Sequence, residues 1–216
     1  MRVLGEGDIL FILWAVRWTL LLSITAFIGG GLGGLLVALA RTSEFAWLRA
    51  ITSWYIKVFQ GTPLLMQLFL AFFMPGIFGF NVDPWMAAAL GLSFNASAFL
   101  GEIWRGAIEV VPKGQTEAAR SLGLGYFTNM FLVVIPQAIK IAIPPTIGFL
   151  VQLIKGTSLA SIIGFVELTR AAQIINNATF RPFTIFTMVA AVYFIVCFPL
   201  SAWSKRMEEK LRVGVR

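Results

Sequence analysis

The chain has few side chains that could take part in covalent chemistry. It has no histidine and one cysteine, Cys197. This excludes a Ser–His–Asp relay, a histidine-bearing zinc site, an internal disulfide and a Cys-x-x-Cys metal or redox site. Ser158 and Lys155 lie three residues apart and could in principle form a nucleophile and its base. Because nothing in the sequence predicts an oxyanion site beside them, a hydrolase is only an alternative interpretation.

A second set of polar residues could bind a ligand without transforming it. A cationic side chain of the protein would bind the carboxylate of a ligand, an anionic side chain would bind its ammonium group, and a side-chain amide could orient either end. Together these groups suit a zwitterion such as an α-amino acid. The alternative is structural, with Lys155 and Glu167 paired with each other or with the backbone and the serines bonded to their own helices. The candidate substrate-binding residues are Asn95, Ser97, Lys155, Thr157, Ser158 and Glu167.

The composition indicates that lipid is the main solvent of this protein. Of 216 residues, 58% are hydrophobic and 12% are charged, whereas soluble domains average about 45–50% and about 25%. The net charge is +7. In so apolar a chain this excess is typical of the cytoplasmic bias of Lys and Arg in membrane loops. We therefore expect membrane lipid, and no nucleic acid, among the partners.

Five stretches are long and apolar enough to cross a bilayer as helices, which takes about 20 residues each. The first ends in Ala38-Leu39-Ala40, a small-x-small pattern, but it exceeds a signal-peptide core in length and we interpret it as an uncleaved span. The sequence predicts an all-α membrane protein with one transmembrane domain over residues 1–216. The predicted spans cover residues 18–40, 58–82, 84–101, 136–154 and 182–204.

The distribution of Lys and Arg predicts the orientation of the five spans. Arg2, Arg17, Arg170 and Arg181 would lie on one side, twelve residues would lie on the other, and Lys155 is unassigned. The positive side is cytoplasmic, so the N-terminus is expected outside and the C-terminus inside. The twelve are Arg41, Arg49, Lys57, Arg105, Lys113, Arg120, Lys140, Lys205, Arg206, Lys210, Arg212 and Arg216.

Glycines at 29–31 and 33–34 in the first span favour close contact with another helix, because small residues let two backbones approach in lipid. The sequence leaves open whether that helix belongs to the same chain. At the cytoplasmic end of the third span, Glu102 and Arg105 are expected to form a local ion pair. Gln67 is expected to pack between helices.

The segment after the third span predicts a short charged helix. Pro112 and Gly114 should end the preceding helix, Thr116 can begin a new one, and Gly123 should stop it after about two turns. Glu117 is spaced to form weak ion pairs with Lys113 and Arg120. With small Ala118 and Ala119 between the charges, this helix suits docking to a partner, although a plain connection between helices is the alternative.

This segment also carries a family resemblance. Residues 117–136 read EAARSLGLGYFTNMFLVVIP. The pattern EAA, three residues, Gly, nine residues and VVIP resembles the signature loop of ABC-importer permeases, with Val for Ile and Ile for Leu as mild departures. In that family the loop forms a coupling helix that binds the ATPase subunit. The resemblance assigns coupling to a cytoplasmic loop over 105–136, through Gln115, Glu117, Ala118, Ala119, Arg120 and Gly123.

Other segments resemble the polar amino acid permeases within that family. They are QGTPLLMQ at 60–67, GEIWRG at 101–106, PKGQ at 112–115 and KGTSL at 155–159. Gln60 replaces a usual Arg, and Gly156 replaces a usual acidic residue, which removes any role that this carboxylate would have. The resemblance extends over nearly the whole chain after Trp18.

The resemblance implies a type I ABC importer permease of the MetI-like fold in the bacterial inner membrane. It implies two ATPase subunits, a second permease copy or paralogue, and an extracytoplasmic amino-acid-binding protein. The chain has no Gly-x-x-x-x-Gly-Lys-Ser/Thr motif. We therefore expect no enzyme activity and no cofactor on this chain, with Mg-ATP held by the partner ATPase. A channel or scaffold without ATP coupling is the remaining alternative.

Overall fold

A computed structural model describes residues 3–213, and this part of the chain is helical with short connections. Arg2 and Arg216, which entered the charge comparison, lie outside the described residues. The helices are α1 (Glu6–Arg41), α2 (Ala46–Gly61), α3 (Leu64–Ile77), α4 (Pro84–Val110), α5 (Lys113–Ser121), α6 (Tyr126–Asn129), α7 (Ile135–Gly156), α8 (Leu168–Thr179) and α9 (Pro182–Val213). A π-helical turn, Met130–Val134, joins α6 to α7, and a 3₁₀ turn, Thr157–Ser161, follows α7.

Four helical segments are long and apolar enough to cross a membrane, and a bent pair of helices makes a fifth candidate. The four are Glu6–Arg41, Pro84–Val110, Tyr126–Ser161 and Pro182–Leu211. The prediction of about five spans in an all-α fold is therefore confirmed. The first span is much longer than the predicted 18–40, because the apolar residues 9–16 continue the helix through Arg17 and back to Glu6.

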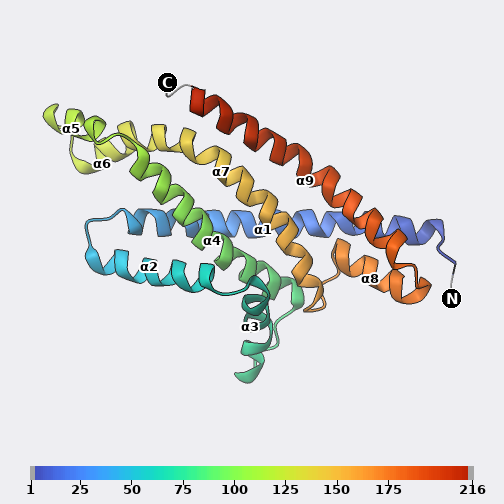
Figure 1. Cartoon of the computed structure of the whole chain (residues 1–216). Coiled ribbons are helices and arrows are strands. Elements are labelled where there is room, and N and C mark those ends of the chain that lie inside the picture. The colour runs from blue at the N-terminus through green and yellow to red at the C-terminus, as the bar shows by residue number, and fades with distance from the viewer. Residues whose placement is uncertain (1–2, 214–216) are drawn as a thin grey trace.

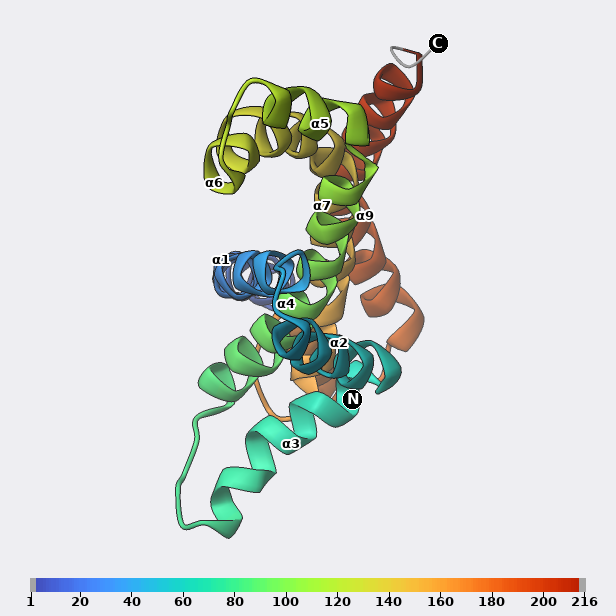
Figure 2. The same ribbon diagram turned by 90° about the vertical axis from the view of Figure 1, so that its left-hand side faces the viewer.

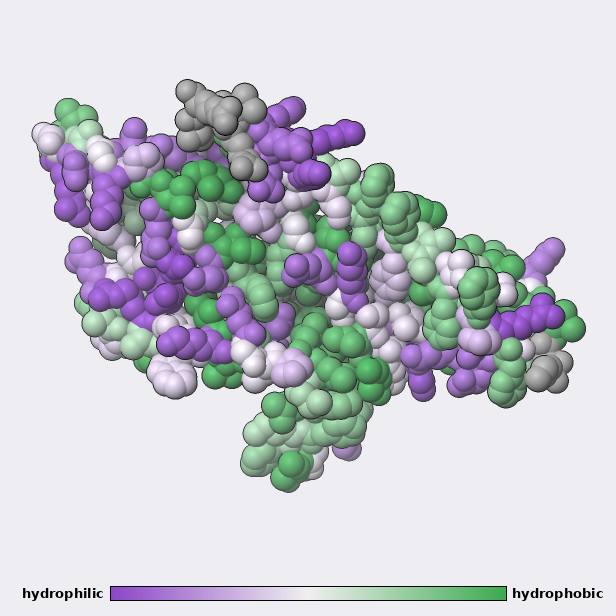
Figure 3. Space-filling model, in the orientation of Figure 1, coloured by the Kyte–Doolittle hydropathy of each residue, from purple (hydrophilic) through white to green (hydrophobic). Residues whose placement is uncertain are grey.

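The expected continuous span over 58–82 is wrong. The chain turns by 104° between α2 and α3. Pro63 lies at the break, where it lacks an N–H for a helical hydrogen bond and holds Thr62 in an extended conformation. As Figure 1 shows, α3 consequently leaves the line of α2 and projects from the body of the molecule. Its projecting surface is apolar in Figure 3.

The amide of Gln67 stabilises this bend. Its nitrogen donates to the carbonyls of Phe59 at 2.7 Å and of Thr62 at 3.1 Å, and to the Thr62 hydroxyl at 2.9 Å. Its oxygen accepts from the side chain of Asn95 on α4 at 2.9 Å. The buried Gln67 therefore satisfies carbonyls that the break leaves without helical partners and ties them to α4, which confirms its expected position between helices.

The packing of α1 against α4 forms the centre of the bundle, and the predicted glycine contact lies within the chain. A Cβ built on Gly30 would lie 2.3 Å from Ala96 Cβ, and one on Gly34 would lie 2.9 Å from Leu100 Cβ. On the α4 side of this contact, Gly101 leaves no room for a side chain against α1. The two backbones therefore touch without intervening side chains, as small-residue interfaces in membranes allow.

The short helix after the third span begins earlier than predicted. α5 starts at Lys113, not at Thr116, because the fixed φ of Pro112 suits a helix entry and its carbonyl accepts from Gln115 N–H at 3.0 Å. It ends as predicted, with Gly123 at a φ of +76° and Leu124 N–H bonded back to the Ala119 carbonyl. Within the described residues, the expected ion pairs of Glu117 with Lys113 and Arg120 do not form.

The fourth span departs from regular α-helical geometry at two places. The π-helical turn inserts an extra residue per turn before α7, and Pro144 and Pro145 lie inside α7 itself. Ser204 on α9 donates to the Pro144 carbonyl at 2.7 Å. The proline pair is therefore fastened to the last span.

We expect Gly30→Ala to lower the thermal stability of the purified permease. Ala forms helices better than Gly by about 1 kcal/mol, but its Cβ would clash with Ala96, and overpacking costs about 1–3 kcal/mol. Gly31→Ala is the matched control, because its Cβ meets nothing nearer than 3.8 Å. A thermal unfolding curve in detergent measures both. An equal midpoint for the two variants would contradict the close α1–α4 contact.

Candidate functional site

A polar pocket of about 210 Å³ lies beside the break between α2 and α3. Residues from α2, α4 and α7 meet there, together with Thr62 and Leu64 at the break itself. None of the residues that line it carries a charge, and its polar atoms come from carboxamides and a hydroxyl. The lining residues are Phe59, Gln60, Thr62, Leu64, Asn95, Phe99, Phe149, Gln152 and Leu153.

Asn95 is the predicted substrate-binding residue that lines this pocket. The side chain is buried, and its amide nitrogen donates to Gln67 at 2.9 Å. This bond fixes the orientation of the carboxamide, since Gln67 is itself held by the helix break. The pocket can therefore offer uncharged hydrogen-bonding groups against aromatic walls, an arrangement suited to a small polar ligand.

The other two carboxamides of the pocket, Gln60 and Gln152, were not among the predicted site residues. Gln60 lies in the Gly-Thr-Pro segment, and Gln152 lies three residues before Lys155. A usable signal was present, because both are polar residues in apolar stretches close to a proline or a helix end. What sequence reasoning could not supply was the bend at Pro63, which brings Gln60 and Gln152 to one pocket.

Glu167 lies elsewhere, in a buried cluster where α1, α8 and α9 meet. Its carboxylate caps the N-terminus of α8, accepting from the N–H groups of Thr169 and Arg170 at 2.9 Å each. It also accepts from the hydroxyls of Tyr193 at 3.1 Å and Thr19 at 3.5 Å. The positive end of the helix favours an anion at this position. Glu167 therefore bonds to backbone N–H groups, as the structural alternative expects, and it forms no ion pair with Lys155.

Of the remaining predicted substrate residues, Thr157 lies beside the Glu167 cluster, where it meets Tyr193, and the others lie elsewhere. Lys155 is exposed at the end of α7, and its carbonyl accepts from the Ser158 hydroxyl at 2.7 Å. Thr157 is fully buried and donates to the Ile154 carbonyl. Ser97 is buried and shares a hydrogen bond with Tyr55 on α2. Asn95 and Ser97 thus lie on different sides of α4.

α5 lies at one end of the bundle, beside α6 and apart from the crossing helices (Figure 2). Ala119 is buried against the chain. The other predicted coupling residues are exposed and point away from the core, so a partner could reach them. The exposed ones are Gln115, Glu117, Ala118, Arg120 and Gly123.

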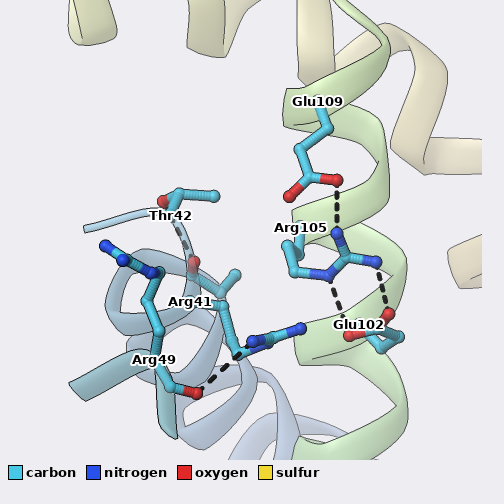
Figure 4. A network of polar contacts seen from close by, with 7 residues as sticks. Arg41, Thr42, Arg49, Glu102, Arg105 and Glu109 are labelled. Atoms are coloured by element: carbon cyan, nitrogen blue, oxygen red, sulfur yellow. Dashed lines mark hydrogen bonds and ion pairs between the residues drawn. The ribbon is translucent and has the colours of Figure 1, made fainter. Parts of the chain in front are cut away.

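A charged network, drawn in Figure 4, lies on the last turns of α4, which lead into α5, and on the neighbouring ends of α1 and α2. The expected pair of Glu102 and Arg105 forms, with the Arg105 Nε donating at 2.9 Å, and Glu109 binds the same guanidinium. Arg41, at the end of α1, donates to the Arg49 carbonyl at 3.3 Å. The contacts of Arg105 with Glu102 and Glu109 therefore stay within α4, whereas Arg41 links α1 to α2.

No cluster suited to a metal ion is found in residues 3–213, where no three Cys, Asp or Glu side chains come together for one.

The comparisons with known proteins identify the family. The family described as "Binding-protein-dependent transport system inner membrane component" matches residues 30–213. The probable amino-acid ABC transporter permease protein YckA of Bacillus subtilis (strain 168) is 37% identical over 93% of this chain and 88% of its own length.

Two solved structures have the same fold. One is described as an amino acid ABC transporter crystallised with histidines, with a TM-score of 0.88, 36% identity, and coverage of 97% of this chain and 100% of its own. The other, the MetNI methionine ABC transporter facing inward, has a TM-score of 0.79 at 18% identity and covers 94% of this chain and 97% of its own. The second likeness concerns the fold alone.

The matched family and the all-helical bundle agree with the type I importer fold expected from the sequence. Members of this family are membrane transport components and not enzymes. The chain therefore belongs to the family of binding-protein-dependent transport system inner membrane components, as a multi-pass permease subunit of an ABC transporter in the bacterial inner membrane.

Proposed function

We propose that this permease carries polar amino acids across the membrane and receives them from an extracytoplasmic binding protein. The observation that carries the proposal is the uncharged polar pocket among Gln60, Asn95 and Gln152, set within an apolar bundle beside a broken helix. Transporters bind substrates at such interrupted helices. The relatives with amino acid permease names support the same substrate class.

Asn95 is the residue that we assign to the substrate pathway from the predicted set, together with Gln60 and Gln152. Carboxamides can donate to a carboxylate and accept from an ammonium group, so they can pass a zwitterion without holding it tightly. Weak holding suits a carrier that is driven by ATP, because the energy enters through the ATPase. Ser97, Lys155, Thr157, Ser158 and Glu167 stay predictions as substrate contacts.

We further propose that α5 couples this permease to two ATP-binding subunits, which hold Mg-ATP. The exposed Glu117 and Arg120 form no ion pair within the described residues and are available to a partner. Ala118 lies between them with a side chain small enough for close approach. Ala119 and Gly123 would fix the helix on this chain, the first by burial and the second by its turn, and Gln115 would complete the contact.

A second permease, identical or paralogous, completes the proposed complex. α3 projects from the bundle (Figure 1) and exposes large apolar side chains, among them Leu70, Phe73 and Ile77. Apolar side chains that stand away from their own bundle suit a neighbouring membrane subunit or lipid. With the end that carries α5 on the cytoplasmic side, the C-terminus is also cytoplasmic and the N-terminus is outside.

We expect Glu117→Arg to abolish the stimulation of ATP hydrolysis by the loaded binding protein in proteoliposomes. Reversing a charge at a docking surface places like charges together and costs several kcal/mol, which corresponds to a loss of at least about tenfold. Glu44→Arg is the matched control, since it makes the same charge change at an exposed turn outside α5. Equal stimulation in both variants would sink the assignment of coupling to α5.

We expect Gln152→Leu to lower amino acid uptake about fivefold, because it removes a hydrogen-bonding group worth about 1 kcal/mol from the pocket. Stimulated ATP hydrolysis should persist, since α5 is untouched. Gln137→Leu is the control, because Gln137 bonds to its own helix at the Val133 carbonyl and does not line the pocket. Radiolabelled uptake measures the effect. Uptake that is unchanged in Gln152→Leu and in Asn95→Leu would exclude this pocket from the pathway.

A further inference from the structure

A second and larger hollow lies between α1, α4 and α7, on a face that the proposed transport pathway does not use. It has a volume of about 600 Å³ and is lined almost entirely by apolar side chains. Its two polar side chains, Trp104 and Thr146, satisfy each other through a hydrogen bond of 3.0 Å. Because its wall offers no free polar group, this α1–α4–α7 groove suits a hydrocarbon and not a polar substrate.

The length of the groove matches one leaflet of a bilayer. Along α1 its lining runs from Phe27 to Leu39, and along α7 from Ile135 to Ile147. Twelve residues of helix rise about 18 Å, and one leaflet contributes about 15 Å of hydrocarbon. A single extended acyl chain has the length to lie in this groove.

Cations lie just beyond one end of the groove. Arg41 follows two residues after Leu39, and it donates to the carbonyl of Arg49 on α2 (Figure 4). Arg49 in turn donates to the carbonyls of Ser43 and Glu44, at 2.8 Å each. Within residues 3–213 neither guanidinium forms an ion pair of its own with a carboxylate, although Arg41 also attracts Glu102, which Arg105 binds. Three guanidinium groups thus share the carboxylates of Glu102 and Glu109, and the network keeps a net positive charge.

The groove is elongated, because its lining follows α1 and α7 for about three turns each. Its wall is apolar and it opens to the outside of the bundle, so an elongated hydrocarbon such as an acyl chain fits it.

We propose that the α1–α4–α7 groove binds the acyl chain of an anionic phospholipid, whose phosphate is held at Arg41 and Arg49. Basic sites at the ends of spanning helices attract anionic headgroups, and the buried chain supplies the hydrophobic part of the affinity. The bound lipid fills the space between α1 and α7 near the end of the bundle that carries α5. This proposal does not depend on which substrate the permease carries.

Trp104 provides the readout, because it lines the groove. The purified permease in detergent is titrated with phosphatidylglycerol or phosphatidylcholine whose acyl chains carry bromine, a quencher of tryptophan fluorescence. The part of the quenching that is lost in the Trp104→Phe variant reports lipid in the groove. We expect half-maximal quenching at a lower concentration of phosphatidylglycerol than of phosphatidylcholine. Arg41→Gln and Arg49→Gln should each raise the concentration of phosphatidylglycerol that gives half-maximal quenching about fivefold. The corresponding concentration of phosphatidylcholine should not change.

Two further variants test the groove itself. Ile139→Phe adds bulk at the half-exposed mouth and should reduce Trp104-dependent quenching by both lipids. Ile195→Phe, on the exposed face of α9, should leave it unchanged. The thermal unfolding midpoint of each variant identifies any that fails to fold.

Three results would overturn the proposal. The first is quenching that does not depend on Trp104, and the second is equal response to both lipids in the presence of Arg41 and Arg49. The third is efficient disulfide formation between two copies of Ile139→Cys, in a Cys197→Ala background, in the native membrane. That last result would mean that a second permease covers the groove.

Discussion

The rest of the structure depends on the direct contact of the α1 and α4 backbones. Lipid tails are as apolar as leucine, so spanning helices gain little from hydrophobic burial and depend on close van der Waals packing. Gly30 and Gly34 allow that packing against Ala96 and Leu100. With α1 and α4 fixed, one side of α4 faces the polar pocket, and the space between α1 and α7 remains as the apolar groove. The position of the groove therefore follows from where the two backbones touch.

The polar pocket exists because a helix is broken and its freed carbonyls are satisfied inside the bundle. In a bilayer no water is available to do this, so each unpaired group costs several kcal/mol. Gln67 resolves the cost with one amide group that bonds to Phe59, Thr62 and Asn95. Because Gln67 bonds both to the freed carbonyls and to Asn95, the same side chain stabilises the bend and fixes the orientation of Asn95 in the pocket.

Several features could be predicted from local sequence because their causes are local. The spans follow from apolar length, the Glu102–Arg105 pair follows from helical spacing, and the end of α5 follows from Gly123. The arrangement of the site could not be predicted, since it depends on the 104° turn at Pro63 and on which face of α4 meets which helix. Glu167 illustrates the limit, because an ionisable residue in an apolar stretch can serve a helix end as well as a ligand.

The irregular fourth span has a mechanical consequence. From Tyr126 to Ser161 it is helical throughout. A rotation applied near α5 would therefore be transmitted along one continuous helix towards Gln152, over a distance of about 39 Å. That helix departs from regular α-helical geometry at the π-helical turn and at the Pro144–Pro145 pair, where regular helical hydrogen bonds are displaced or missing. A rotation applied near α5 would therefore change the helix most easily at these two places, and the hydrogen bond from Ser204 ties the second of them to α9.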